Sequence, residues 1–183
     1  ATHIGTGKLD DAYHQQLARG ISQAVLAAEK NLSPAQLAHG SFNRPDLIAC
    51  RRFLCKPGTV DPNPFGIGGE RIKSVSGRSS EVIKPAGPVD PQFSVLSLQH
   101  IDGTPLAVLG NFSVHYCGGY QRGIVSADYF GHYAAALESS LATGKGHPAV
   151  VGIMSNGTSG NTGAIQRGGK KYEPFEWIKV SGR

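Results

Sequence analysis

Apolar side chains recur at helical spacing in two stretches of the chain. The first stretch opens with Asp10 and Asp11, whose carboxylates suit a helix N-terminus, and it ends near Asn31. The second opens with Ser126 or Asp128, either of which can cap a helix. The apolar faces are made by Tyr13, Leu17, Ile21, Ala24, Val25 and Ala28 in the first stretch and by Phe130, Tyr133, Leu137 and Leu141 in the second. This spacing predicts two amphipathic helices.

Other stretches favour β-strands. Residues 93–100 and 105–115 alternate between apolar and polar positions, and Asp102-Gly103 between them is typical of a hairpin turn. A short strand is also expected at residues 36–42. The run Ala149-Val150-Val151 predicts a buried strand, because it is short, apolar and β-branched.

The order of these elements predicts an α/β protein with a mixed β-sheet and flanking helices. Residues 56–91 differ from the rest, because they are rich in Pro, Gly and Ser and show little periodicity. Such a long irregular segment in a compact domain is usually functional or covers a site. No internal repeat or break in composition divides the chain, so we expect residues 1–183 to form a single domain.

Composition narrows the classes of partner. The net charge of +5 is modest and the Lys and Arg residues are scattered, so we expect no nucleic acid partner and no polybasic membrane anchor. No apolar run approaches the ~20 residues that cross a bilayer, so we expect no transmembrane segment. Cys50, Cys55 and Cys117 are compatible with one disulfide and a free thiol or with three thiols, and they do not reveal the compartment.

The stretch from Gly152 to Asn161 is the first candidate for chemistry. It follows the predicted strand at residues 149–151 and is rich in glycine and hydroxyl residues, and loops after strands are where ligands gather in α/β folds. Glycines on both sides of Ser159 would let backbone N–H groups and a substrate approach closely. An ordinary Gly/Ser turn is the alternative interpretation.

Two histidines are candidates for metal binding or proton transfer. His115 is expected at the end of a strand, close to the pair Gly118-Gly119. His3 precedes a Gly/Thr loop near the N-terminus. Each could instead be a structural histidine with ordinary hydrogen-bond partners. No HExxH or HxH motif is present, so no local spacing establishes a metal site.

A series of short matches, in order along almost the whole chain, resembles the neutral/alkaline non-lysosomal ceramidase family and its shorter bacterial members. The matching stretches are Ala1-Thr2-His3, residues 56–60, 62–65, 85–91 and 94–96, Asn111-Phe112-Ser113-Val114-His115, residues 126–131, and residues 155–161. Each match is short, and the ordered series is what makes the resemblance specific.

The resemblance implies a zinc-dependent amidohydrolase that cleaves the N-acyl amide bond of ceramide-like lipids. By position, His3 and His115 would be zinc ligands and Ser159 would be the active-site serine. Neutral imidazoles suit zinc, but a catalytic zinc site usually has three protein ligands, so two histidines underfill it. The choice between attack by the serine and attack by a zinc-bound water stays open.

The substrate would be held by other residues of the same segments. Arg51 matches an Asn-Arg pair of the family that anchors polar groups of the substrate, with Cys50 in place of the Asn. We also expect Asn156, Gly157 and Gly160 to contact the substrate, the glycines through backbone N–H groups that stabilise an oxyanion.

The chain departs from the family pattern in ways that leave two functions open. Gly5 replaces the second histidine of the first motif, Asn161 stands where relatives often carry Asp, and the family's remaining zinc ligands, a Glu and a Tyr, lie downstream of residue 183. We therefore expect part of a larger domain, which a second chain could complete. The alternative is a non-catalytic subunit or binding module with an incomplete metal site. The resemblance also implies a secreted or periplasmic location, or one peripheral to a membrane.

Overall fold

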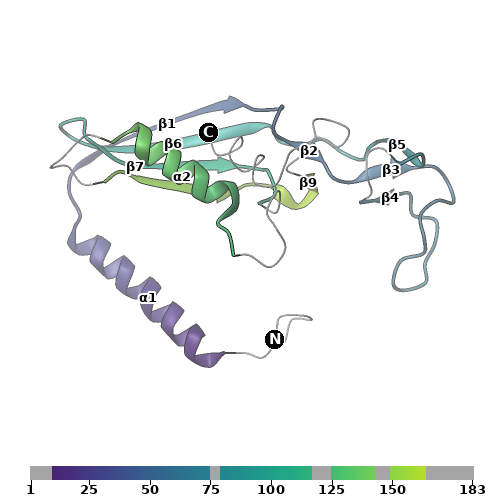
Figure 1. The fold of residues 1–183 in the computed structure, drawn as a ribbon, viewed down its shortest axis with the longest axis horizontal. Helices are drawn as coiled ribbons and strands as arrows, with labels where there is room; N and C mark the ends of the chain where they lie inside the picture. Colours follow the sequence, from purple (N-terminus) through teal and green to yellow (C-terminus); the bar gives the residue numbers. More distant parts are fainter. Residues whose placement is uncertain (1–9, 75–78, 117–124, 143–148, 164–183) are drawn as a thin grey trace. The chain divides into compact units, whose positions relative to one another are not determined.

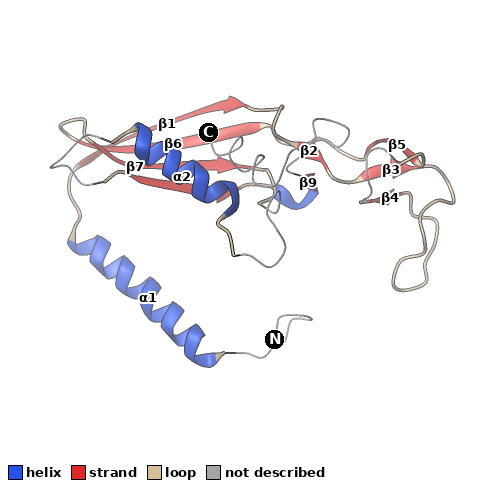
Figure 2. Cartoon of the chain, viewed as in Figure 1, coloured by secondary structure: helices blue, strands red, loops and turns tan. Residues whose placement is uncertain are grey.

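A computed structural model describes residues 10–74, 79–116, 125–142 and 149–163 of the chain. The chain divides into two compact units, residues 1–34 and 35–183, which are described separately below. Figures 1 and 2 show the elements of both.

The first unit contains helix α1 (Asp11–Lys30). Asp10 caps it, accepting a hydrogen bond from the Tyr13 N–H at 3.0 Å, as its place before the apolar pattern predicted. The predicted apolar face is present but not buried: the side chains of Ile21 and Val25 are 58% and 63% exposed. The reason is that the described residues of this unit contain no other helix or strand to cover that face.

The second unit is built on a four-stranded mixed sheet in the order β1-β6-β7-β8 (Figure 1). Its strands are β1 (Ala35–Asn43), β6 (Gln92–His100), β7 (Pro105–Phe112) and β8 (Val151–Asn156). Strand β6 pairs antiparallel with both β1 and β7, and β8 runs parallel to β7. The sequence therefore predicted the α/β class and the mixed sheet correctly.

Local chemistry explains the hairpin between β6 and β7. Gly103 has φ 87°, a conformation that glycine adopts without steric cost, and the Asp102 carboxylate accepts from the Thr104 N–H at 2.9 Å. The expected turn is confirmed.

Helix α2 (Asp128–Ser140) connects β7 to β8 and packs on one face of the sheet (Figure 1). The Tyr133 ring lies 5.7 Å from the Phe93 ring of β6. At Gly152 in β8, an added Cβ would lie 2.7 Å from Ala134 Cα, so a glycine is needed for this close approach. The buried core consists of Leu47, Ile48, Phe93, Phe112, Val114, Tyr129 and Met154.

Two smaller sheets complete this unit. Strand β3 (Phe53–Cys55) lies between β4 (Ile72–Lys73) and β5 (Val82–Pro85), and β2 (Ala49–Cys50) pairs with β9 (Thr162–Gly163). Strands β4 and β5 fall inside residues 56–91, where no strand was expected. Their pairing with β3 depends on contacts distant in sequence, which periodicity does not report. The other described residues of that segment form turns and irregular backbone.

Three element boundaries differ from the predictions. Strand β7 ends at Phe112 rather than near His115, and β8 continues through Gly152 to Asn156, where a loop was expected. Ser126 does not occupy the N-cap position of α2, which is Ala127, although its hydroxyl accepts from the Asp128 N–H at 3.0 Å.

Among the described residues, no helix has the length and apolarity to cross a membrane.

Candidate functional site

Residues 113–115, called here the histidine segment, follow β7 and are held by hydrogen bonds from outside their own strand. The Phe112 carbonyl, at the end of β7, accepts from the Gly157 N–H at 2.9 Å. The Ser113 carbonyl accepts from the buried Thr162 hydroxyl at 2.6 Å. The histidine segment is therefore ordered by its neighbours even though it is not part of the sheet.

The Val114 carbonyl accepts two further hydrogen bonds. The Tyr129 hydroxyl on α2 donates at 2.8 Å, and the Asn156 side-chain amide at the end of β8 donates at 2.7 Å. Val114 and Tyr129 are both fully buried. The peptide unit that leads into His115 is thus fixed from two sides.

The serine loop, residues 157–161, is bonded to the histidine segment. The Thr158 N–H donates to the Ser113 hydroxyl at 3.1 Å, and the two hydroxyls lie 3.2 Å apart. The Thr162 hydroxyl, which donates to Ser113, also lies 3.0 Å from the Ser159 carbonyl oxygen. The structure therefore brings the segments of His115 and Ser159 together in one hydrogen-bonded region.

The two glycines that flank Ser159 have different surroundings. A Cβ on Gly157 would lie 2.5 Å from the Ser113 hydroxyl oxygen, and the Gly157 N–H already donates to the Phe112 carbonyl. Gly157 is therefore a close-packing position, and its amide proton points at β7. Gly160 is exposed, with nothing within 4 Å of the position that a Cβ would take. It is the glycine of the pair that a substrate can approach.

Arg51 lies beside the serine loop through its backbone. Its N–H donates to the Asn161 carbonyl at 2.9 Å, next to the pairing of β2 with β9. The Asn161 side chain accepts instead from the Arg52 guanidinium at 2.8 Å. The Arg51 Nε is buried and has no hydrogen-bond partner among the described residues, so this nitrogen is a donor that those residues leave unsatisfied.

His115 carries the second orphaned nitrogen of the described residues. Its Nδ1 is buried and accepts or donates no hydrogen bond within that part of the chain, while its ring lies 5.4 Å from the Tyr116 ring. A buried, unpaired imidazole nitrogen is the donor atom that a zinc ion uses. His115 therefore fits the role of a metal ligand.

The described residues do not complete a metal site. No group of three or more His, Cys, Asp or Glu side chains that could hold a metal occurs among them. His3 lies outside the described residues. A complete zinc site therefore needs donors from residues other than those described.

An apolar groove of about 340 Å³ begins at β2, beside the serine loop. It lies between strands β2 and β3 on one side and the end of the 56–91 segment on the other. Its lining residues are Ile48, Ala49, Cys50, Phe53, Pro85, Gly87, Pro88 and Val89. The groove has the composition of a site for an alkyl chain.

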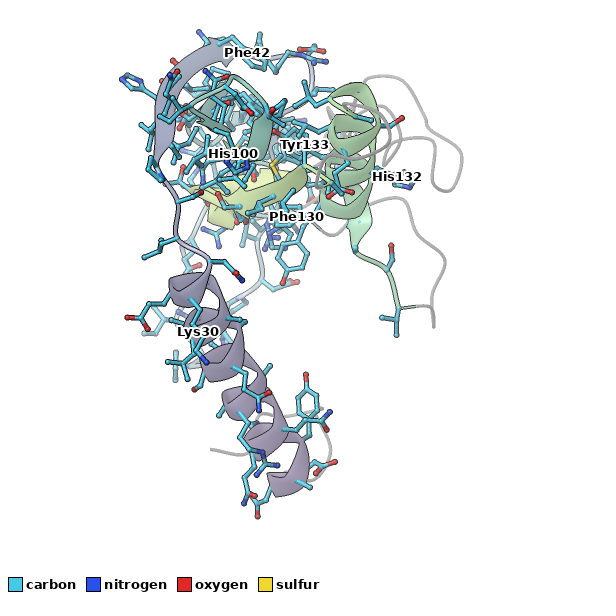
Figure 3. The ribbon with its side chains drawn as sticks, turned by 90° about the vertical axis from the view of Figure 1, so that its left-hand side faces the viewer. Lys30, Phe42, His100, Phe130, His132 and Tyr133 are labelled. Atoms are coloured by element: carbon cyan, nitrogen blue, oxygen red, sulfur yellow. The ribbon has the colours of Figure 1, made fainter. Side chains whose placement is uncertain are left out.

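Sequence reasoning missed Tyr129 and Thr162. The helical stripe placed Phe130 and Tyr133 toward the sheet, and Figure 3 shows them there, with His132 pointing away. Tyr129 lies in the same core cluster, and its hydroxyl donates to the histidine segment, a contact that helical periodicity does not report. Burial raises the pKa of Tyr129, and a hydrogen bond with Asn156 partly offsets that rise.

Comparisons with known proteins find similarity in the fold but none in the sequence-based searches. No protein family description and no curated protein matches this sequence. The fold is similar to part of the neutral ceramidase from Pseudomonas aeruginosa, with a TM-score of 0.58 and 18% identity over 90% of this chain and 23% of that chain. It is also similar to a ceramidase complexed with C2, with a TM-score of 0.54 and 18% identity over 82% of this chain and 20% of that chain.

These neighbours confirm, at the level of the fold, the resemblance drawn from the short ordered motifs. The chain has the fold of a partial ceramidase-like domain and spans about a quarter of the length of the ceramidase chains it matches.

Proposed function

We propose that this chain is part of a zinc-dependent amidohydrolase that cleaves the N-acyl amide bond of ceramide-like lipids. The observation that carries the proposal is the buried Nδ1 of His115, which has no hydrogen-bond partner among the described residues, in a segment hydrogen-bonded to the loop of Ser159. The ceramidase-like fold supports it. The resemblance extends the proposal to a secreted or periplasmic protein, or one that is peripheral to a membrane.

His115 would hold the zinc ion together with His3 and with donors from the remainder of the domain, in this chain or a second one. When bound, zinc would polarise the amide carbonyl and lower the pKa of a coordinated water to about 7. A buried donor such as the His115 Nδ1 suits this role, because it has no hydrogen bond to give up among the described residues.

The other residues of the site would bind and orient the substrate. Ser159 would attack the carbonyl or donate a hydrogen bond to the developing oxyanion, and the exposed Gly160 would leave space for the substrate beside it. Arg51, whose Nε has no partner in the part of the chain that the structure describes, would bind polar groups of the lipid. Gly157 and Asn156 would support the backbone of the site and would not contact the substrate. Their N–H groups already donate to carbonyls of residues 112–114.

The acyl chain would lie in the apolar groove between β2 and residues 85–89. Cys50 lines the groove, and the backbone of Arg51, the next residue, bonds to the serine loop, so a lipid amide held at that loop could place its alkyl chain there. Burial of about 0.8 kcal/mol per CH₂ would then add to the affinity for long acyl chains.

A non-catalytic subunit or binding module is the second candidate. It is favoured by the absence of a three-ligand group from the described residues. Such a module would bind lipid amides through the same groove and release no fatty acid.

Fatty acid release from a ceramide separates the two candidates. The amidohydrolase predicts release by the zinc-loaded chain that falls at least 10²-fold in Ser159→Ala and in His115→Ala. His132→Ala, at an exposed histidine on α2, is the matched control and should keep full activity. Binding of the ceramide without release would favour the module.

A further inference from the structure

We propose that Tyr129 and Asn156 are positioning residues for the imidazole of His115. They contact the peptide unit before it and fix the direction in which the ring enters the site. The inference rests on the proposed function, since it matters most if His115 holds a metal.

The first argument is the geometry of a single carbonyl. The Val114 oxygen accepts from the Tyr129 hydroxyl at 2.8 Å and from the Asn156 amide at 2.7 Å. A carbonyl oxygen has two lone pairs, so these two donors saturate it. Because the peptide bond is planar, this oxygen shares a rigid plane with the N and Cα atoms of His115. Fixing the oxygen therefore fixes the backbone that carries the imidazole.

The second argument is that the pairing of the sheet strands does not hold the backbone before His115. Strand β7 ends at Phe112, so the ladder of the sheet does not hold residues 113–115. Two elements that are distant in sequence reach the same carbonyl, Tyr129 from α2 and Asn156 from β8. Within the described part of the chain, the Val114 carbonyl is held by these two side chains, which makes them determinants of the backbone direction at His115.

The third argument is the backbone at the start of α2. Asp128 has φ 50°, and it is the one residue other than glycine with positive φ in the described part of the chain. Its carboxylate accepts from the Tyr129 N–H at 2.7 Å. Strained positions persist where the surrounding structure fixes them, and they concentrate at functional sites. Here the strained residue directly precedes the buried tyrosine that holds the histidine segment.

A purely structural role for the tyrosine makes a different prediction from a positioning role. If Tyr129 only fills the core, Tyr129→Phe should cause a small loss of stability and should not affect His115. Replacing a positioning residue would change the environment of the His115 ring and the affinity of His115 for a metal. Outer-shell partners of this kind typically change metal affinity 10–100-fold when removed.

The test uses Tyr129→Phe, with Tyr133→Phe as a matched control one turn along the same helix. The first measurement is the NMR signal of the His115 ring carbons in the metal-free chain, and the second is the affinity of the chain for zinc. We expect Tyr129→Phe to broaden or split the His115 ring signals and to weaken zinc binding about 10–100-fold. Tyr133→Phe should leave both unchanged, because its ring packs against Phe93 instead.

Asn156→Ala is the second variant, and it keeps the test decisive if Tyr129→Phe does not fold. It removes the other donor to Val114 and should broaden the same ring signals. Sharp, single His115 signals and unaltered zinc affinity in every folded variant would overturn the inference and leave the proposed function standing. Perturbed ring signals in a chain whose wild type binds no zinc would overturn the proposed function and leave the positioning role standing.

Discussion

The Thr162 hydroxyl donates a 2.6 Å hydrogen bond to the Ser113 carbonyl across 49 residues of sequence. Thr162 is almost completely buried, and its hydroxyl also lies 3.0 Å from the Ser159 carbonyl oxygen. One side chain therefore connects the segment that carries His115 with the loop that carries Ser159. This contact makes the candidate site a single structural unit.

Thr162→Val should destabilise the chain, because the isosteric side chain leaves the buried Ser113 carbonyl without its donor. We expect the free energy of unfolding to fall by about 1–3 kcal/mol, measured by urea denaturation. Thr162→Ser keeps the hydroxyl and should lose less. Equal stability of the valine variant and the wild type would show that the hydrogen bond contributes nothing.

Gly157→Ala should be more harmful than Gly160→Ala. A Cβ at position 157 would lie 2.5 Å from the Ser113 hydroxyl oxygen, whereas one at position 160 meets nothing within 4 Å. We expect a cost of about 1–3 kcal/mol for the first variant, which is typical of overpacking, and little change for the second. Thermal unfolding of the two variants compares them directly, and equal melting temperatures would contradict this account of the loop.

Stability should fall as the pH rises above about 10, the usual tyrosine pKa. Burial raises the pKa of Tyr129 and of Tyr133, so between the unfolded and folded values the unfolded chain has released protons that the folded chain keeps. The unfolded state is then favoured by up to about 1.4 kcal/mol per pH unit through Tyr129, and by less through the partly exposed Tyr133. Denaturation at several alkaline pH values measures the slope, and a slope in Tyr129→Phe as steep as in the wild type would contradict the assignment to Tyr129.

Gly87→Leu should discriminate against long acyl chains. Gly87 lines the apolar groove at β2 and has open space at its Cβ position, so a leucine would fill the groove without displacing its walls. Losing burial of about two CH₂ groups corresponds to about a tenfold loss in affinity for an N-hexadecanoyl sphingosine, with little change for the N-acetyl form.

Gly40→Leu is the control for this groove variant. Gly40 also has open space, but it lines a separate cavity of about 470 Å³ on strands β1, β6 and β7. Calorimetric titration with both lipids would compare the variants. If only Gly40→Leu weakened the affinity for the long-chain lipid, the acyl site would have to be assigned to the second cavity.

Features encoded over a few residues were predictable from the sequence. The Asp10 cap and the hairpin at Gly103 depend on neighbouring residues, and both are present as predicted. Arg51 and Ser159 were singled out by resemblance, and the structure bonds the Arg51 backbone to the serine loop. Their roles stay predictions.

Features that depend on distant contacts were not predictable. The glycine at position 152 predicted the start of a loop, but Gly152 lies within β8, where it pairs with Val108 of β7 and Ala134 of α2 packs directly against it. Tyr129 and Thr162 carry no local signal, since each acquires its role through a carbonyl of the histidine segment. Only the tertiary arrangement identifies such residues.

Zinc content is the most direct test of the central claim that His115 is a metal ligand. The chain, together with the part of the domain or the second chain that supplies the other donors, would be equilibrated with zinc, passed through a desalting column and assayed for metal by mass spectrometry, beside His115→Ala and His132→Ala. The account predicts stoichiometric zinc in the wild type and in His132→Ala and its loss in His115→Ala. Stoichiometric zinc retained by His115→Ala, or none bound by the wild type, would contradict it.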